Sequence, residues 1–178
     1  EFYPKLKLYH NWWYKERDHD QDGLCEFGST DGTVIAAKWE SGMDNAVRFD
    51  DSKILKNGEK AFSLDQESVD LNSFLYAEKN YLQKMAEVLK LTEESKKWKE
   101  ESTALKVKVQ NQFWDAATGW FYDTTIDGKT LIKAMGCEGY LPVWAEVATA
   151  EQAQLAKQNM LDTASLNTFV PLPTLAAN

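Results

Sequence analysis

Hydrophobic residues recur at intervals of three and four positions in several parts of the chain, a spacing typical of amphipathic α-helices. Between positions 5 and 17 they are Leu6, Tyr9 and Trp13, and Pro4 lies where the first turn of a helix tolerates proline. A stronger pattern covers positions 65–91, with apolar residues at Leu71, Phe74, Leu75, Leu82, Met85 and Leu89. Both stretches are therefore predicted to be helices.

Another long helix is predicted directly after position 91. Thr92 is a suitable N-cap, and the apolar residues that follow at near-helical spacing are Trp98, Leu105, Val109 and Phe113. Because only a few residues separate this helix from the preceding one, the two should form an antiparallel αα-hairpin.

The last third of the chain mixes turn and helix signals. The segment 115–133 is rich in aromatic residues and contains Asp127-Gly128, which indicates a small β-hairpin. Thr149 and Gln152 fit a capping box that opens a last helix, ending near position 161. A mainly α chain of helical hairpins is typical of a helical barrel or a helical solenoid, and the lack of a repeat of fixed period disfavours the solenoid.

Composition sets the size and the kind of partner. The 178 residues, 43% of them hydrophobic, suffice for one domain with a sizeable core. With 28 acidic and 20 basic residues the net charge is -8, which argues against nucleic acid and anionic membranes as partners. The 7 Trp residues suit a core and also flat contacts with sugar rings, so we expect at least one in a ligand cleft.

The ends of the chain and its two cysteines add little information about function. No apolar run is long enough to span a bilayer and no signal pattern opens the chain, which begins with Glu1 rather than Met. We expect a mature or excised segment, and a location outside the cytoplasm is favoured. Cys25 and Cys137 lack metal-ligand spacing, and a disulfide between them is left open.

An acidic loop carries the first candidate site. Asp18, Asp20, Asp22 and Gly23 form the pattern D-x-D-x-D-G, in which alternate carboxylates can converge on one hard cation, as in calcium loops of the EF-hand type. The loop departs from an EF-hand because its twelfth position is a serine, so Glu26 at the ninth would supply the late carboxylate. A solvated acidic turn without a cation is the alternative.

The sequence "KWESGMDN" carries the second candidate site. A general acid must keep its proton near neutral pH, and Trp39, Met43 and Glu40 could provide apolar and negatively charged surroundings for Asp44. The alternative is structural, because Asp and Glu beside a glycine more often cap a helix or form a turn.

Four motifs in order along the chain resemble glycoside hydrolase family 63, in particular its bacterial α-glucosidase branch. They are "YHNWWYKERDHDQDGLCEFGS" at 9–29, "KWESGMDN" at 38–45, "QESVD" at 66–70 and "NTFVPL" at 167–172. The resemblance implies an (α/α)6 catalytic domain in which Asp44 is the general acid and Trp39 and Glu40 lie beside it in the cleft. It also implies a Ca²⁺ ion held by Asp18, Asp20, Asp22, the Leu24 carbonyl, Glu26 and Glu67.

The same resemblance implies that the chain is incomplete. Enzymes of this family invert the anomeric configuration, and their general base lies in a segment beyond the "NTFVPL" motif that this chain lacks. The helices predicted here make about half a toroid, so residues 1–178 are expected to be a partial catalytic domain. The rest of the domain, or another copy, would complete the barrel. Glu138, between two glycines, is the other loop carboxylate expected near the cleft, as a substrate-binding residue, and a role as substitute general base is the less favoured alternative.

Two other functions stay open. A calcium-stabilised helical interaction module without catalytic activity would explain the acidic loop equally well. A helical-repeat scaffold would explain the αα-hairpin but neither acidic motif. The leading prediction is an inverting α-glucosidase that acts on oligosaccharides.

Overall fold

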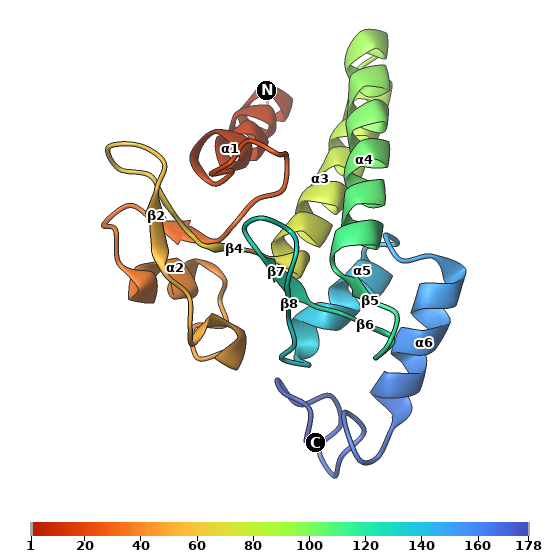
Figure 1. The fold of residues 1–178 in the computed structure, drawn as a ribbon. Coiled ribbons are helices and arrows are strands. Elements are labelled where there is room, and N and C mark those ends of the chain that lie inside the picture. Colours follow the sequence, from red (N-terminus) through yellow and green to blue (C-terminus); the bar gives the residue numbers. More distant parts are fainter. Residues whose placement is uncertain (1, 178) are drawn as a thin grey trace.

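A computed structural model describes residues 2–177, and its longest elements are two antiparallel helices that extend away from the small sheets and the C-terminal helices (Figure 1). The two long helices are α3 (Val69–Val88) and α4 (Thr92–Gln112), and α1 (Tyr3–Glu16) packs against α3. The other helices are α2 (Val34–Glu40), α5 (Leu141–Trp144), α6 (Ala150–Leu161) and the short 3-10 helices η1 (Val47–Phe49) and η2 (Cys137–Tyr140). The described chain is thus mainly helical, as predicted.

The αα-hairpin predicted from hydrophobic spacing is present, with two differences at its ends. Helix α3 begins at Val69 rather than near position 65, because Gln66 and Glu67 pair with another strand. Thr92 is the first residue of α4 instead of its N-cap, which is Leu91 and makes no side-chain capping bond. The tight connection also places Lys90 at a φ of 59°, in the left-handed region. The local sequence did not predict this conformation, which is uncommon for residues other than glycine.

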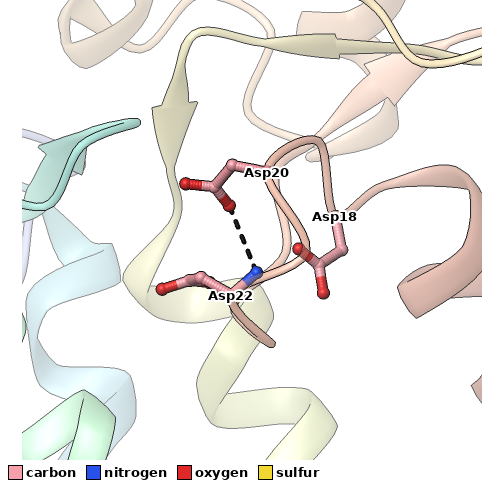
Figure 2. A group of neighbouring side chains, drawn as sticks. All are labelled: Asp18, Asp20 and Asp22. Atoms are coloured by element: carbon pink, nitrogen blue, oxygen red, sulfur yellow. Dashed lines mark hydrogen bonds between the residues drawn. The ribbon is translucent and has the colours of Figure 1, made fainter.

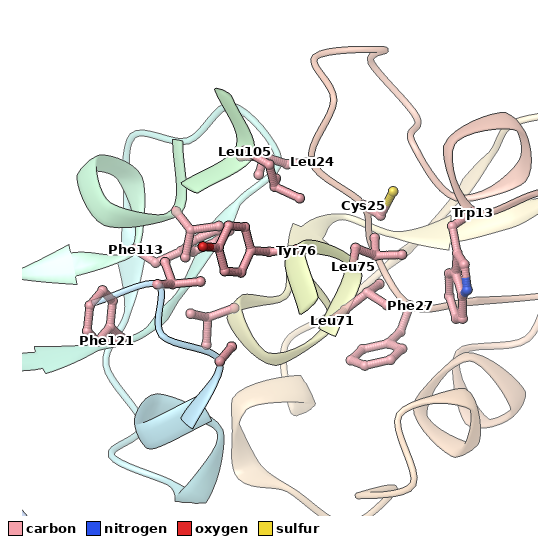
Figure 3. Packing of buried hydrophobic residues seen from close by; sticks show 14 of the residues in the cluster. Trp13, Leu24, Cys25, Phe27, Leu71, Leu75, Tyr76, Leu105, Phe113 and Phe121 are labelled. Atoms are coloured by element: carbon pink, nitrogen blue, oxygen red, sulfur yellow. The ribbon is translucent and has the colours of Figure 1, made fainter. Parts of the chain in front are cut away.

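The main core lies where α3 meets α4 and the N-terminal loop (Figure 3). Leu71, Leu75 and Tyr76 of α3 pack with Leu24 and Phe27 of the loop that follows α1. A second cluster joins α1 to the hairpin through Tyr3, Leu82, Ala86 and Trp98. Burial of each large side chain contributes about 1.5–3 kcal/mol, so these contacts fix the loop after α1 against the hairpin.

Three small antiparallel sheets link the helices. The first has the order β1-β3-β2, with β1 Gly28–Ser29, β3 Phe62–Leu64 and β2 Ile54–Lys56. The second has the order β4-β7-β8, with β4 Gln66–Glu67, β7 Asp123–Thr125 and β8 Leu131–Ile132. The third pairs β5 (Trp114–Asp115) with β6 (Trp120–Phe121). The single hairpin predicted over 115–133 is therefore two short hairpins, and Asp127-Gly128 lies in the second, as expected.

The capping box that was predicted to open the last helix is present. The Thr149 hydroxyl accepts from the Gln152 amide at 3.1 Å, and the Gln152 side chain accepts from the Thr149 amide at 3.0 Å. Cys25 and Cys137 are both free thiols, which settles the disulfide question. Among the described residues, no helix combines the length and apolar character needed to cross a bilayer.

Candidate active site and metal centre

The acidic loop between α1 and β1 draws its three aspartates together (Figure 2). Carboxylate oxygens of Asp18, Asp20 and Asp22 lie within 4.8 Å of one another. The backbone holds them in place, since the Asp22 amide donates to Asp20 at 3.3 Å and the Gly23 amide donates to Asp18 at 3.0 Å. Gly23 has a φ of +86°, a conformation that glycine adopts without strain.

Two glutamates complete this group. Glu26 and Glu67 each bring an oxygen within 4.8 Å of the other and of Asp20, so five carboxylates gather around the loop. Glu67 comes from β4, far from the loop in sequence but adjacent to it in the fold. Helix α4 closes one side, where the Lys108 ammonium donates to the Asp22 carbonyl and the Gln112 amide donates to Glu67.

Burial and mutual proximity dominate the electrostatics of this group. Burial, together with the neighbouring carboxylates, raises the pKa of Asp18 to about 6, of Glu26 to about 9 and of Glu67 to about 8. One oxygen of Asp18 and one of Glu26 are buried without any hydrogen-bond partner. Hard cations such as Ca²⁺ take six to eight oxygen ligands, so the donor set and its unpartnered oxygens are suited to one. The predicted carboxylates thus come together, while the ligand role of the Leu24 carbonyl stays a prediction.

Asp44 lies on the turn after α2 and lines a cavity of about 380 Å³. Residues Gly42 to Arg48, from the turn and η1, form one wall of this cavity, which Glu138 and the segment around Leu175 also line. Asp44 itself is exposed. The apolar cover that a general acid needs is therefore not supplied by the described residues.

Glu138 is the buried carboxylate of this cavity. It is only 3% exposed, and burial raises its pKa to about 7 even though the Arg48 charge opposes that rise. Gly136 leaves room for it, because a side chain there would meet the Glu138 carboxylate at 2.3 Å. The structure therefore brings Asp44 and Glu138 to one cavity.

A buried ion cluster lies under this wall. Arg48 donates to Asp70 at 2.6 Å and to Asp123 at 3.1 Å, and all three side chains are buried. Asp70 lies in the first turn of α3 and Asp123 belongs to β7, so Arg48 joins the segment after Asp44 to two other elements. Its guanidinium also lies 4.5 Å from the centre of the Phe49 ring.

Trp39 and Glu40, predicted beside Asp44, do not line the cavity. Trp39 is 66% exposed on α2. Both Glu40 oxygens are engaged by the protein, with Arg17 donating two bonds at 2.8 Å and the Gly28 amide donating one at 2.7 Å. Sugar binding by these two residues stays a prediction, and the contacts of Glu40 are those of a structural carboxylate.

The whole chain, residues 1–178, matches the mannosylglycerate hydrolase MGH1-like glycoside hydrolase domain. The chain belongs to this glycoside hydrolase family. The resemblance to family 63 drawn from the four motifs is thereby confirmed.

Solved structures extend the MGH1-like assignment to the fold. An uncharacterized conserved protein from Thermus thermophilus superposes with a TM-score of 0.74 at 20% identity, covering 99% of this chain and 49% of its own. The GH63 mannosylglycerate hydrolase of the same organism, in complex with glucose, gives a TM-score of 0.66 at 20% identity, covering 89% and 43%. A neutral trehalase from Saccharomyces cerevisiae gives 0.65 at 24% identity, covering 80% and 26%.

These neighbours share the (α/α)6 fold, so the described helices are part of such a toroid. The chain spans about half the length, or less, of the solved structures it matches.

Sequence reasoning about this MGH1-like domain missed its buried arginines. Arg17 and Arg48 belong to no periodic pattern, and their carboxylate partners are distant in sequence. The one available signal was that each lies within four residues of a predicted site residue, Asp18 or Asp44.

Proposed function

We propose that this chain is part of an inverting glycoside hydrolase in which Asp44 protonates the glycosidic oxygen of an α-linked glucoside. The observation that carries the proposal is the position of Asp44, which lines the same cavity as the buried Glu138. Membership in the MGH1-like family supports the reaction class.

The second carboxyl group of the reaction comes, in this proposal, from residues outside the chain. Inverting enzymes keep the acid and the base roughly 6.5–9.5 Å apart, which leaves room for the attacking water. Glu138, which lines the cavity, accepts hydrogen bonds from sugar hydroxyl groups. Trp39, which is exposed outside the lining of that cavity, offers an apolar face to a sugar ring.

The acidic loop holds Ca²⁺ in this proposal. The ligands are the carboxylates of Asp18, Asp20, Asp22, Glu26 and Glu67, with the Leu24 carbonyl as a sixth group. When bound, the ion neutralises their mutual repulsion and fixes the loop. The support is the meeting of five carboxylates, two of them with buried unpartnered oxygens.

The rest of a catalytic domain, or a second copy of the chain, covers the open side of these helices. Apolar side chains are exposed along neighbouring parts of α1 and α3, among them Leu6, Tyr9, Tyr81, Met85 and Val88. Contiguous apolar surface of this kind usually marks an interface, and the matched structures are about twice as long.

The proposal is tested by sugar release from α-linked glucose disaccharides and from mannosylglycerate, the compound in the name of the family and of one matched structure. The chain is assayed alone and joined to the helices that complete its domain. Asp44→Asn should abolish release, whereas Asp51→Asn, at an exposed aspartate nearby, should leave it unchanged. Release that survives Asp44→Asn would refute the assignment of the acid.

A calcium-stabilised module without catalytic activity is the second candidate. It is favoured by the exposure of Asp44, which lacks apolar cover. The completed domain separates the two functions, because this candidate predicts Ca²⁺ binding without sugar release from any substrate.

A further inference from the structure

Glu40 is bonded to both ends of the acidic loop. Its two oxygens accept from Arg17, the residue before Asp18, and one of them also accepts from the amide of Gly28, two residues after Glu26. The loop is closed between these ends by the Glu26 amide, which donates to the Arg17 carbonyl at 2.8 Å. One carboxylate from α2 thus clamps the whole loop at its base.

The clamp is held in a tight environment. The Arg17 side chain is 1% exposed, and its guanidinium lies 4.7 Å from the centre of the Trp12 ring. At Gly28 a Cβ atom would lie 2.6 Å from Arg17 Nε and 1.9 Å from the Phe62 carbonyl oxygen, so only glycine can be accommodated. A displacement of either loop end therefore has to move Glu40 or break its hydrogen bonds.

Glu40 is also the last residue of α2, directly before the turn that carries Asp44. Hydrogen bonds tie the start of this turn to α2: the Ser41 amide donates to the Lys38 carbonyl at 3.1 Å and the Gly42 amide to the Trp39 carbonyl at 3.0 Å. The Met43 amide donates to the Ser41 hydroxyl at 3.0 Å, and the Ala46 amide donates to the Met43 carbonyl at 2.9 Å, on the other side of Asp44. A movement of Glu40 is thereby passed to the turn.

We propose that the Arg17–Glu40 pair couples cation binding in the acidic loop to the position of Asp44, which makes Glu40 a positioning residue. The inference rests on the cation site and the general acid of the proposed function. Without a cation, buried oxygens of Asp18 and Glu26 lack a partner and the ionised carboxylates of the group repel one another, so the loop is free to open, which moves Arg17 and Gly28. A bound cation draws the loop together and holds Glu40, and with it the turn, in place.

Coupling between two sites is reciprocal, so a change at Glu40 must alter cation affinity although Glu40 is not a ligand. Calorimetric titration of the calcium-free chain with Ca²⁺ should give a dissociation constant about tenfold higher for Glu40→Gln than for the wild type. The matched control is Glu94→Gln, since Glu94 also accepts from two side chains, Tyr3 and Lys7, but at the N-terminal end of α1. Its dissociation constant should equal that of the wild type.

Hydrogen exchange measures the coupling in the opposite direction, from cation binding to the turn that carries Asp44. In the wild type, Ca²⁺ should slow amide exchange in the acidic loop and also in residues 41–46. In Glu40→Gln it should slow exchange in the loop alone. Arg17→Lys keeps the charge but loses the bidentate contact with Glu40, so it should behave like Glu40→Gln. If circular dichroism shows that Glu40→Gln is unfolded, Arg17→Lys is used in its place.

The outcomes separate this inference from the proposed function. If the wild type binds Ca²⁺ and both variants keep its affinity and its slowed exchange at 41–46, the coupling is refuted while the cation site stands. If the wild type takes up no Ca²⁺, the cation site and the coupling both fail. Sugar release by the completed domain is measured independently, and its absence would refute the hydrolase alone.

Discussion

The two acidic regions of this chain differ in how much of their surroundings the chain itself provides. Around the acidic loop, carboxylates from two distant segments meet, and Asp18, Glu26 and Glu67 are all buried. Around Asp44, the turn after α2 lines a cavity together with the buried carboxylate Glu138, and Asp44 itself is exposed.

The difference bears on which site this chain can form by itself. The carboxylates of the acidic loop come from residues 18–67, all within the chain, and their loop packs against the core. Asp44 is exposed at its cavity, and the matched structures are about twice as long as this chain. We therefore expect the chain to bind a cation by itself and to need its missing helices for catalysis.

The largest effect should come from the ion cluster beneath the Asp44 wall. Arg48→Met leaves Asp70 and Asp123 buried without their cation, which should lower the free energy of unfolding by about 3–5 kcal/mol. Chemical denaturation measures it. The control Lys133→Met removes a pair with Asp115 that is half exposed and should cost about 1 kcal/mol or less. Equal losses would mean that the cluster does not support the wall.

Calcium should have the next largest effect, and on the other region. At a hundredfold excess over the dissociation constant, a bound ion stabilises the folded state by about 2.7 kcal/mol, which raises the melting temperature. Without calcium, Glu26→Gln should melt higher than the wild type, because burial raises the pKa of Glu26 to about 9 and its carboxyl must take up a proton on folding at neutral pH. The variant should gain less from the ion. A wild type whose melting is insensitive to both Ca²⁺ and a chelator would contradict the cation site.

A smaller effect is expected from pH at Glu138. Its pKa is raised in the folded state to about 7, so between its ordinary pKa and that value the folded chain binds more protons than the unfolded one. Its contribution to stability is therefore complete at acid pH and is lost as pH rises through 7. Glu138→Gln lacks this loss, so the wild type should fall by about 1–2 kcal/mol relative to the variant between pH 5 and pH 8. If the stability of the two proteins changed with pH in parallel, Glu138 would not be shielded from solvent and its pKa would not be raised.

The smallest effect should come from Asp44 itself. Because its side chain is exposed, Asp44→Asn should change the free energy of unfolding by less than about 0.5 kcal/mol. Thermal melting of both proteins at one Ca²⁺ concentration is the measurement. A large loss would mean that Asp44 is a structural residue and would remove the contrast between the two regions.

Periodic hydrophobic spacing was enough to predict the long elements of this fold. Helices α3 and α4 lie within stretches predicted from their repeating apolar face, and α1 begins two residues before its predicted stretch. Helix α6 was predicted from its capping box instead. Strand β4 was mistaken for the start of α3, because its pairing with Thr125 depends on contacts far along the chain. Helix α2 is only seven residues long, too short for periodicity to stand out.

The candidate site was predictable as motifs and less so as contacts. D-x-D-x-D-G places alternate oxygens on one loop by local geometry, so Asp18, Asp20 and Asp22 could be grouped from spacing. Glu67 came from family resemblance, because β4 approaches the loop only in the folded chain. The partners of Glu40 were not foreseen at all, since a bond between positions 17 and 40 leaves no pattern in the sequence.

The most direct test of the account is the configuration of the first sugar released by the completed domain, followed by proton NMR from an α-linked glucose disaccharide. Inversion with Asp44 as the acid predicts that the β-anomer of glucose appears first and that Asp44→Asn abolishes its release. Release of the α-anomer first, or of β-glucose at an unchanged rate from Asp44→Asn, would contradict it.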